Sequence, residues 1–250
     1  MRHFALALTF AIGLIATGAG QARADAALTP AQTKAVEHII HDYLVAHPEV
    51  LMEAIAAAEN KDKAKEAARA EQTIHDRHAE IYDDPDGEIG GNPKGDVTIV
   101  EFFDYRCPYC KEVQPALETL LKNDPKVRII YKEFPILGPA SVYASRIALA
   151  ARRQGKYIAF HRAMMDAKGT ITDAVVLRVA AAVGIDTKKA KAEMNAPEID
   201  AVIKKDYALA DALDIQGTPA FIIAGRLIPG AVDYANLMRL VVAARHAHAG

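Results

Sequence analysis

Apolar residues follow a helical period along the chain between residues 29 and 58. Thr29 before Pro30 is typical of a helix N-cap with proline at the first helical position, and His47 before Pro48 marks a break between two helices. The apolar side chains on each side of this break repeat at helical spacing. The first stripe comprises Val36, Ile39, Ile40, Tyr43 and Leu44, and the second comprises Val50, Leu51, Ala54, Ile55 and Ala58. The pattern predicts two short amphipathic helices in succession.

A polar stretch separates these stripes from the rest of the chain. Between residues 60 and 80 large apolar residues nearly vanish and charged residues crowd together, which predicts a solvated helical arm. The turn-rich segment 83–93 closes the region. Each large apolar side chain left in water costs about 1.5–3 kcal/mol relative to burial. We therefore predict that residues 25–82 form a helical oligomerisation region with its arm; the alternative is that the two helices fold back onto the following domain.

The pattern changes to that of an α/β domain after residue 93. Residues 97–103 form a near-continuous apolar run rich in β-branched and aromatic residues, as expected of a strand buried on both faces. Residues 127–134 predict a second central strand. Residues 139–213 carry helical patterns, with internal turns predicted at Ile171-Thr172-Asp173 and Gly184-Ile185-Asp186. A hairpin is predicted over residues 221–229 and a closing helix over residues 234–245. The sequence contains no internal repeat that would change this interpretation.

The first 24 residues are typical of a secretory signal. Arg2 gives a positive start, residues 4–19 are apolar, and Ala22-Arg23-Ala24 fits a small-x-small cleavage site. The alternative, a membrane anchor, is disfavoured because the apolar run falls short of the ~20 residues that span a bilayer. We expect export, with cleavage after about Ala24, into an oxidising space such as a bacterial periplasm.

Composition and charge exclude several classes of protein. Hydrophobic residues make up 51% of the 250 positions and charged residues 25%, which is ordinary for a globular protein and not for a disordered one. Without the signal, which carries two arginines and no acid, 28 basic and 32 acidic side chains leave a formal charge of −4. A chain without a basic field is not expected to bind nucleic acid. Two cysteines are too few for a disulfide scaffold or an all-cysteine zinc ribbon.

Two pairs of histidines are spaced three residues apart, His38 with His41 and His75 with His78. On a helix each pair would be able to face one metal ion. No carboxylate or cysteine completes an obvious ligand set, so we expect solvated surface histidines and no metal site.

The two cysteines stand in Cys107-Pro108-Tyr109-Cys110, directly after the predicted strand and at the start of a helix. Unpaired amides and the helix dipole favour a thiolate on the first cysteine and lower its pKa below the usual ~8.5. Cys107 is therefore the predicted nucleophile, and Cys110, one turn further on, is placed to resolve a mixed disulfide. Pro108 and Tyr109 tune the balance between the two thiols, and Arg106 adds positive charge.

Three other interpretations of this cysteine pair have less support in the sequence. A structural bridge would close so small a loop that it would constrain the unfolded chain little. A zinc site would need further ligands, and only scattered histidines are available. Two soft thiolates can hold Cu(I), but a small copper carrier does not need a chain of this length. Dithiol redox chemistry is the favoured interpretation, with no cofactor beyond a redox-active disulfide between Cys107 and Cys110.

The cysteine motif after VTIVEFFDY, together with the later GTPAF, resembles the DsbA-like branch of the thioredoxin superfamily over residues 87–245. The N-terminal helices, with HPEVLMEAI, most resemble the ScsC-type (suppressor of copper sensitivity) periplasmic proteins. The resemblance implies an α/β thioredoxin fold with a helical insertion at about residues 139–213. It also implies a DsbA-like domain over residues 83–250, preceded by the N-terminal oligomerisation region.

The resemblance further implies roles for individual residues. Thr218 and Pro219 would be joined by a cis peptide bond that faces the dithiol and presents the Thr218 backbone to an extended client segment; a generic X-Pro bond is cis only about 5–6% of the time. Glu101 occupies the position of the family's buried acid, where it is able to accept the proton of Cys110. The alternative for Glu101 is an acid on an outward strand face. Pro115 resembles the helix-kinking proline of thioredoxins.

The spacing of the cysteines does not distinguish a dithiol oxidase from an isomerase or reductase, because strong and weak oxidants both have two cysteines separated by two residues. Thr218 before the proline resembles the family's isomerases, and an oligomerising stalk would shield Cys107 from the enzyme that reoxidises monomeric oxidases. We therefore predict a periplasmic protein disulfide isomerase or reductase; the alternatives are a DsbA-type oxidase and a copper-binding protein that uses the same thiols. The implied partners are client proteins with thiols or disulfides, a membrane thiol reductase or oxidase that resets the dithiol, and further copies of the chain.

Overall fold

The computed structural model describes residues 28–248, so the expected signal segment, residues 1–24, lies outside the described residues. The chain forms two compact units, one up to Glu59 and one from Asn60 onward. The helices are α1 (Pro30–Ala46), α2 (Pro48–Asp76), α3 (His78–Tyr82), α4 (Pro108–Asn123), α5 (Pro139–Arg152), α6 (Tyr157–Asp166), α7 (Asp173–Ala182), α8 (Thr187–Glu193), α9 (Pro197–Ala212) and α10 (Tyr234–His248). The strands are β1 (Glu88–Gly91), β2 (Val97–Phe103), β3 (Val127–Glu133), β4 (Ala220–Ile223) and β5 (Arg226–Pro229).

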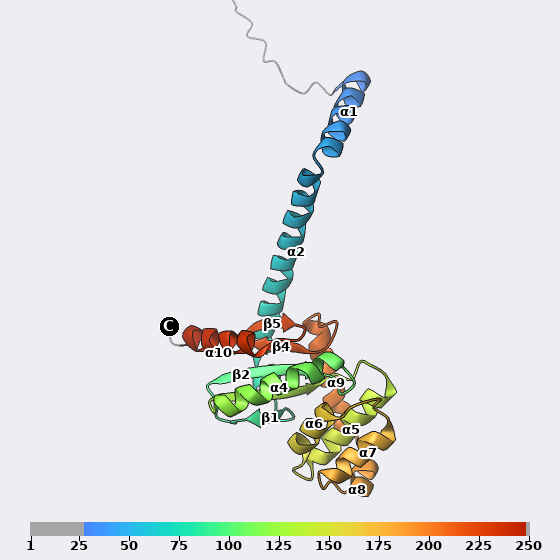
Figure 1. Ribbon diagram of the computed structural model, residues 1–250, viewed down its shortest axis with the longest axis vertical. Coiled ribbons are helices and arrows are strands. Elements are labelled where there is room, and N and C mark those ends of the chain that lie inside the picture. The colour runs from blue at the N-terminus through green and yellow to red at the C-terminus, as the bar shows by residue number, and fades with distance from the viewer. Residues whose placement is uncertain (1–27, 249–250) are drawn as a thin grey trace, which may run out of the picture. The chain divides into compact units, whose positions relative to one another are not determined.

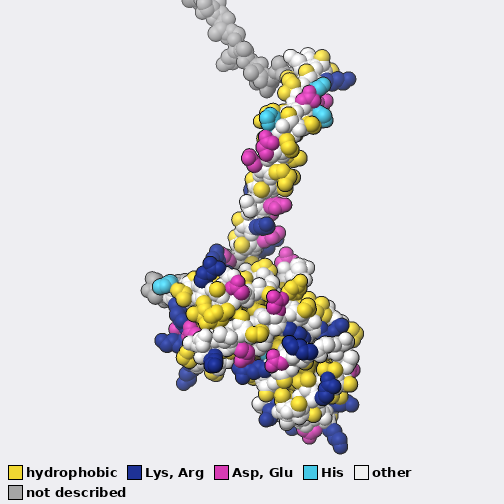
Figure 2. All heavy atoms as spheres, viewed as in Figure 1, with side chains coloured by type: hydrophobic (Ala, Val, Ile, Leu, Met, Phe, Trp, Pro, Cys, Tyr) yellow, Lys and Arg dark blue, Asp and Glu magenta, His cyan; other side chains and the backbone are white. Residues whose placement is uncertain are grey.

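The first unit holds α1 and the start of α2. Thr29 and Gln32 form a capping box at the start of α1, in which each side chain accepts a hydrogen bond from the backbone N–H of the other residue. α1 contains no buried residue, and Figure 2 shows hydrophobic side chains along both helices. The exposed apolar residues include Val36, Ile39, Ile40, Tyr43, Leu51 and Ile55. The stripe predicted from the sequence is thus open to solvent in the single chain that the structure describes.

The break between the two helices lies where the sequence predicts it, but the second helix is longer than expected. His47 separates α1 from α2, because Pro48 is unable to continue the first helix. α2 then runs for 29 residues without interruption, so the second apolar stripe and the charged arm form one helix. Lysine, glutamate and alanine are good helix formers, which explains why the charged stretch continues the helix.

Five strands form one sheet in the order β1-β3-β2-β4-β5 (Figure 1). β2 and β3 are parallel, and the other neighbours are antiparallel. All residues of β2 except Thr98 are buried, which explains its continuous apolar pattern. The sequence pattern does not predict β1, because its glycines lie within the turn-rich segment 83–93. The α/β order, with a long helical segment between β3 and β4, agrees with the fold class that the resemblance implies.

The other predicted elements agree with the structure to within a few residues. β3 ends at Glu133 instead of residue 134, and α10 continues to His248 instead of ending at residue 245. Within the helical segment, Thr172 caps α7 and Asp186 caps α8, at the two places where the sequence predicts internal turns.

Helices cover both faces of the sheet. α4 and α10 pack on one face, and α6 of the segment between β3 and β4 packs against α4 (Figure 1). On the other face α3, α9 and the end of α2 enclose a second apolar cluster, which includes Ile74, Ile81 and Leu209. Because Ile74 is buried there, the C-terminal part of α2 belongs to the second unit.

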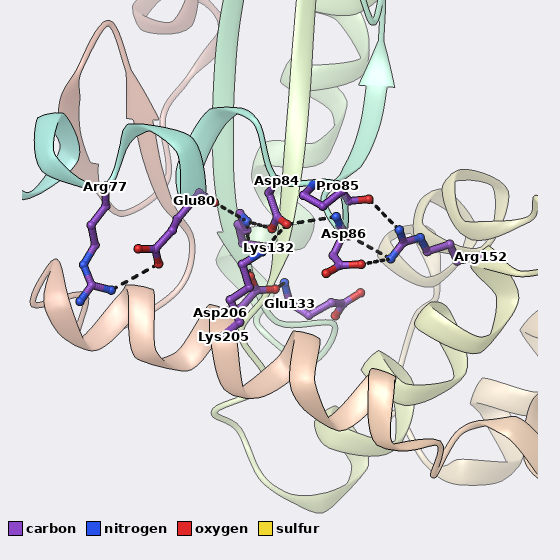
Figure 3. A network of polar contacts seen from close by, with 10 residues as sticks. All are labelled: Arg77, Glu80, Asp84, Pro85, Asp86, Lys132, Glu133, Arg152, Lys205 and Asp206. Atoms are coloured by element: carbon purple, nitrogen blue, oxygen red, sulfur yellow. Dashed lines mark hydrogen bonds and ion pairs between the residues drawn. The ribbon is translucent and has the colours of Figure 1, made fainter.

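A buried ionic cluster joins the segment after α3 to the sheet and to α9 (Figure 3). Lys132 of β3 is fully buried, and its Nζ donates to the carboxylate of Asp84 and, at 3.2 Å, to the main-chain oxygen of Glu80. The same Nζ lies 3.5 Å from a carboxylate oxygen of Asp206, and Lys205 donates to the other oxygen of Asp84. Burial alone would raise the pKa of Asp84, but the hydrogen bonds from the two lysines outweigh it and lower that pKa.

Lys132→Met should therefore destabilise the protein strongly. The substitution keeps the length of the side chain but takes the cation away from two buried carboxylates, and removing one member of a buried ion pair costs about 3–5 kcal/mol. The free energy of unfolding in urea measures this loss. Lys204→Met, at the exposed neighbouring position of α9, is the control and should change stability by less than about 0.5 kcal/mol. Equal stability of the two variants would contradict the role of the cluster.

Candidate active site

Strand β2 leads the chain directly to the two cysteines. β2 ends at Phe103, and α4 begins at Pro108 with Cys107 as its N-cap residue in an extended conformation. Proline suits the first helical position because no N–H partner is needed there. Cys110 lies in the first turn of α4 and is fully buried, whereas Cys107 keeps 4% of its surface exposed. Both cysteines are free thiols at the N-terminus of one helix.

Hydrogen bonds stabilise the thiolate of Cys107. The largest contribution comes from the side chain of Cys110, and the Thr218 side chain and the N–H groups of Tyr109 and Cys110 add to it, against an opposing effect of burial. Together they lower the pKa of Cys107 to about 6. When protonated, the thiol donates to the main-chain oxygen of Thr218, at a distance of 3.1 Å from Sγ. At pH 7 the reactive thiolate therefore predominates.

The surroundings of Cys110 and Glu101, unlike those of Cys107, favour the neutral form of each side chain. Burial, the hydrogen bond with Cys107 and the charge of Glu101 raise the pKa of Cys110 far above its usual value. Glu101, on β2, is also fully buried, and neither of its carboxylate oxygens has a hydrogen-bond partner among residues 28–248. Burial, together with the charge of Cys107, raises the pKa of Glu101 to about 8. At pH 7 the resting site therefore carries its negative charge on Cys107, beside a neutral thiol and a neutral carboxyl group.

The pairing of β4 with β2 brings the loop before β4 to the cysteines. The antiparallel register places Thr218 and Pro219 just past the end of β2, close to the start of α4. The peptide bond between these two residues is cis, as the resemblance implies. The Pro219 oxygen accepts a hydrogen bond from the N–H of Gly230 at 2.9 Å, whereas the Thr218 N–H has no partner in the part of the chain that the structure describes. A free backbone donor therefore lies next to Cys107.

Asp104, which the sequence analysis does not single out, holds the loop between β2 and Cys107. Its fully buried carboxylate accepts hydrogen bonds from the Ser141 hydroxyl at 2.8 Å, the Arg106 N–H at 2.7 Å and the Leu137 N–H at 2.9 Å. Three fixed donors around one carboxylate leave the loop little freedom. An acid directly after an apolar strand is the one signal in the sequence that points to this role.

Lys111, next to Cys110, joins α4 to the helical segment. Its ammonium group donates to the main-chain oxygens of Met164 at 2.6 Å, Met165 at 3.3 Å and Ala167 at 2.9 Å. These carbonyl groups form the C-terminal end of α6, where a cation is favoured by the helix dipole. The sequence alone assigns no role to Lys111, because its partners are more than 50 residues away.

The remaining residues of the cysteine motif have different surroundings. Tyr109 is 60% exposed, so its ring is open to solvent beside the thiols. The guanidinium of Arg106 donates to the main-chain oxygen of Leu137. Pro115 lies inside α4, one turn after Cys110.

The histidines noted in the sequence have exposed acidic neighbours. His38 lies 2.7 Å from Asp42, and His78 lies 3.6 Å from Asp83. Among the described residues no three His, Cys, Asp or Glu side chains are grouped so that they could hold a metal ion. Nor does any helix between residues 28 and 248 have the length and apolarity to cross a membrane.

Comparison with protein families identifies both parts of the chain. Residues 98–242, more than half of its length, match the family described as the DSBA-like thioredoxin domain. The chain belongs to the DsbA-like thioredoxin family. Residues 32–65 of this DsbA-like protein match a second family, described as the N-terminal domain of the copper resistance protein ScsC. These matches confirm the fold class and the resemblance inferred from the sequence.

Solved structures of similar proteins agree with this assignment. A thioredoxin-like oxidoreductase from Silicibacter pomeroyi DSS-3 is 46% identical with a TM-score of 0.66, over 67% of this DsbA-like chain and 97% of the other. ScsC of Proteus mirabilis, in a transitional conformation, is 32% identical with a TM-score of 0.65, over 87% of this chain and 98% of the other.

Curated proteins match part of the chain. The thiol:disulfide interchange protein DsbA of Bordetella parapertussis is 26% identical over 156 residues, which make up 59% of this chain and 74% of that protein. Sodium/proton antiporters also match, among them NhaA 3 of Salinispora tropica, which is 29% identical over 164 residues. The DsbA-like chain spans 25% of the length of that antiporter, so this similarity concerns one segment of a much longer protein.

Proposed function

We propose that this DsbA-like protein is an exported protein disulfide isomerase or reductase that acts through Cys107 and Cys110. The observation that carries the proposal is the unequal pair: an N-capping cysteine with a pKa of about 6 beside a buried cysteine whose pKa is raised. An enzyme that shuffles disulfides attacks a client bridge with a thiolate, and Cys107 supplies one at neutral pH. Thr218 before the cis-proline supports the isomerase direction through its resemblance to the family's isomerases.

The reaction starts at Cys107. Its thiolate attacks one sulfur of a client disulfide, the client S–S bond breaks, a Cys107–client bond forms and the second client sulfur leaves as a thiolate. In isomerisation another client thiolate attacks the client sulfur of this mixed disulfide, which forms a new client bridge and releases Cys107 without net transfer of electrons. In reduction Cys110 attacks the sulfur of Cys107 instead, which breaks the bond between Cys107 and the client and forms the Cys107–Cys110 disulfide. The client leaves as a dithiol, and the two electrons that reduce it come from the Cys107–Cys110 pair.

Glu101 serves the reduction branch as the base for Cys110. Formation of the mixed disulfide removes the charge of Cys107, which is one of the two causes that raise the pKa of Glu101. The pKa of Glu101 then falls below about 8, and its carboxylate becomes available near neutral pH. Since its two oxygens have no hydrogen-bond partner among the described residues, the carboxylate is free to take the proton of the Cys110 thiol.

Three further residues support the exchange. Thr218 offers its N–H to the backbone of a client segment, and Pro219 removes a competing donor at the next position. Between the cysteines, Pro108 starts the helix without needing an N–H partner, and Tyr109 presents an N–H to Cys107 and an exposed ring to the client.

The N-terminal helices join copies of the chain. Ile39, Ile40 and Tyr43 of α1 are each more than half exposed, and burial of each such side chain gains about 1.5–3 kcal/mol. The match of residues 32–65 to the ScsC N-terminal domain supports self-association of this segment. The region of residues 25–82 is therefore assigned to oligomerisation and the following residues to catalysis.

Export and resetting complete the proposed cycle. A signal segment over residues 1–24 would send the protein to the periplasm, where disulfides form and persist. After a client is reduced, the Cys107–Cys110 disulfide has to be reduced by another dithiol. A membrane thiol reductase is the chemical class of partner that supplies those two electrons.

Glu101→Gln should slow the resolving attack of Cys110 about 100-fold near pH 7 and remove the inflection at the pKa of Glu101 from its pH profile, because glutamine does not accept a proton. In the unmodified protein the rate should rise with pH through the pKa of Glu101, since only its ionised form acts as the base. Stopped-flow release of a chromophoric thiol from a mixed disulfide with Cys107 measures the step. Glu112→Gln, at an exposed position of α4, is the control. Identical pH profiles for the Glu101 variant and this control would exclude the role of Glu101.

Full-length mature protein should reactivate scrambled ribonuclease A, and Ile39→Lys should lose most of that activity. A buried lysine on the apolar stripe would prevent copies of the chain from associating, so light scattering should show the mass of a single chain for the variant and a multiple of it for the parent. Oxidation of a dithiol peptide should persist in both proteins.

His38→Lys places a lysine on the face of the same exposed helix that is opposite the stripe and should behave as the parent. Failure of the parent protein to reactivate the scrambled substrate would remove the isomerase proposal. An Ile39→Lys variant that keeps the parent's mass would remove the role of the stripe.

A further inference from the structure

A groove of about 520 Å³ opens beside the loop that precedes β4. One wall is α2, whose residues Lys63, Glu66, Ala67 and Ala70 recur at helical spacing on one face. The segment 212–220 and the end of β5 provide the rest of the lining. Figure 1 shows the C-terminal part of α2 next to β5, and all of these residues belong to the second compact unit. The volume lies in the range of roughly 300–1,000 Å³ that is usual for binding sites.

The groove reaches the cis-proline loop that lies beside Cys107. Thr218 and Pro219 line it, and the Thr218 oxygen lies 3.1 Å from the Sγ of Cys107. Each residue of an extended chain spans about 3.3 Å, so the residues next to a client cysteine bonded to Cys107 have to pass close to Thr218. The Thr218 N–H, which has no partner in the described part of the chain, is then available to their backbone.

Gly217 keeps the groove open next to Thr218. Its φ does not lie in the left-handed region, so the backbone conformation does not require glycine. A Cβ at this position would meet no atom within 4 Å, so close packing inside the protein does not require glycine either. Because Gly217 lines the groove, the open space above it belongs to the groove. When neither the backbone conformation nor internal packing requires a glycine, the remaining reason for one is the close approach of a bound backbone.

The lining suits a polypeptide segment better than a single charged ligand. The floor is apolar, since Leu213, Ile215 and Ala220 are buried beneath it. Charged side chains of both signs stand at the rim, namely Lys63, Arg69, Glu66 and Asp214. An apolar floor with balanced charges at the rim accepts an apolar side chain together with a neutral main chain.

We propose that α2 and the cis-proline loop together bind the extended segment of a client protein that flanks the cysteine reacting with Cys107. The proposal rests on the proposed function and adds the arm helix to the substrate site. The occupant is a client chain because the groove reaches the loop beside the reactive thiol, where the client cysteine has to be. The small side chains of Ala67 and Ala70 leave room for a client side chain in the groove.

The test compares Ala67→Trp with Ala68→Trp in the full mature protein, both combined with Cys110→Ser so that the mixed disulfide is the end product. Ala67 lines the groove, whereas Ala68 is also exposed on the same helix but is not among the lining residues. Two disulfides are offered to Cys107: oxidised glutathione, and an extended peptide whose single cysteine is bonded to glutathione. In each reaction the Cys107 thiolate forms the new S–S bond and glutathione leaves as a thiolate, and mass spectrometry follows both adducts.

Ala67→Trp should lower the ratio of the peptide rate to the glutathione rate about tenfold relative to Ala68→Trp, because the indole fills the space of the client segment. Gly217→Ala, which meets no atom of the protein, should lower the ratio in the same direction. Equal ratios in the two tryptophan variants, with both disulfides reacting, would overturn the assignment of the groove to a client segment and leave the proposed function standing.

Two other results have different meanings. If the Cys110→Ser parent reacts with neither disulfide, the proposed function fails and the groove assignment fails with it. If Ala67→Trp alone changes the particle mass in light scattering, the groove is a contact between copies of the chain, and its assignment to a client segment is overturned.

Discussion

The hydrogen bonds that meet at the Sγ of Cys107 are the constraint on which the rest of the site depends. They come from the buried Cys110, from Thr218 and from the first turn of α4, and they make the Cys107 thiol acidic, while burial keeps the Cys110 thiol protonated. Two cysteines that are three positions apart thus differ in charge at neutral pH. This difference supports the proposal that Cys107 attacks a client, while Cys110 keeps its proton until Cys107 has lost its charge by forming a bond to that client.

The fold supplies this arrangement by bringing three separate segments to one end of the sheet. β2 ends at the turn into α4, the antiparallel pairing of β4 with β2 places the cis-proline loop beside that turn, and Asp104 fixes the loop between strand and helix. Glu101 lies on the same side of β2 as Ile99 and Phe103, which pack in one cluster with the cysteines, and it has no hydrogen bond among the described residues to hold it in the charged form. The scaffold therefore sets the charge of the site through burial and fixed donors.

How much the sequence predicts depends on whether a feature is local. Residues 97–103, the cysteine motif and the turn at Thr172 follow from local patterns, and the structure agrees with them. The unbroken α2 and the short β1 are not predicted, because a charged but helix-favouring stretch looks like a loose arm and a glycine-rich strand looks like a turn. The burial of Lys132 and the partners of Lys111 depend on residues about 50 positions away, which no local pattern contains.

The reduction potential of the Cys107–Cys110 pair as a function of pH, measured in the Glu101→Gln variant so that only the two cysteines take up protons, tests most directly whether the reduced site is one thiolate and one thiol at pH 7. Each proton taken up with the two electrons shifts the potential by about 30 mV per pH unit. Below the pKa of Cys107, about 6, reduction takes up two protons, and above it one. The account predicts a slope of about 59 mV per pH unit at lower pH that falls to about 30 mV per pH unit by pH 7. A slope that stays near 59 mV per pH unit up to about pH 8 would contradict it.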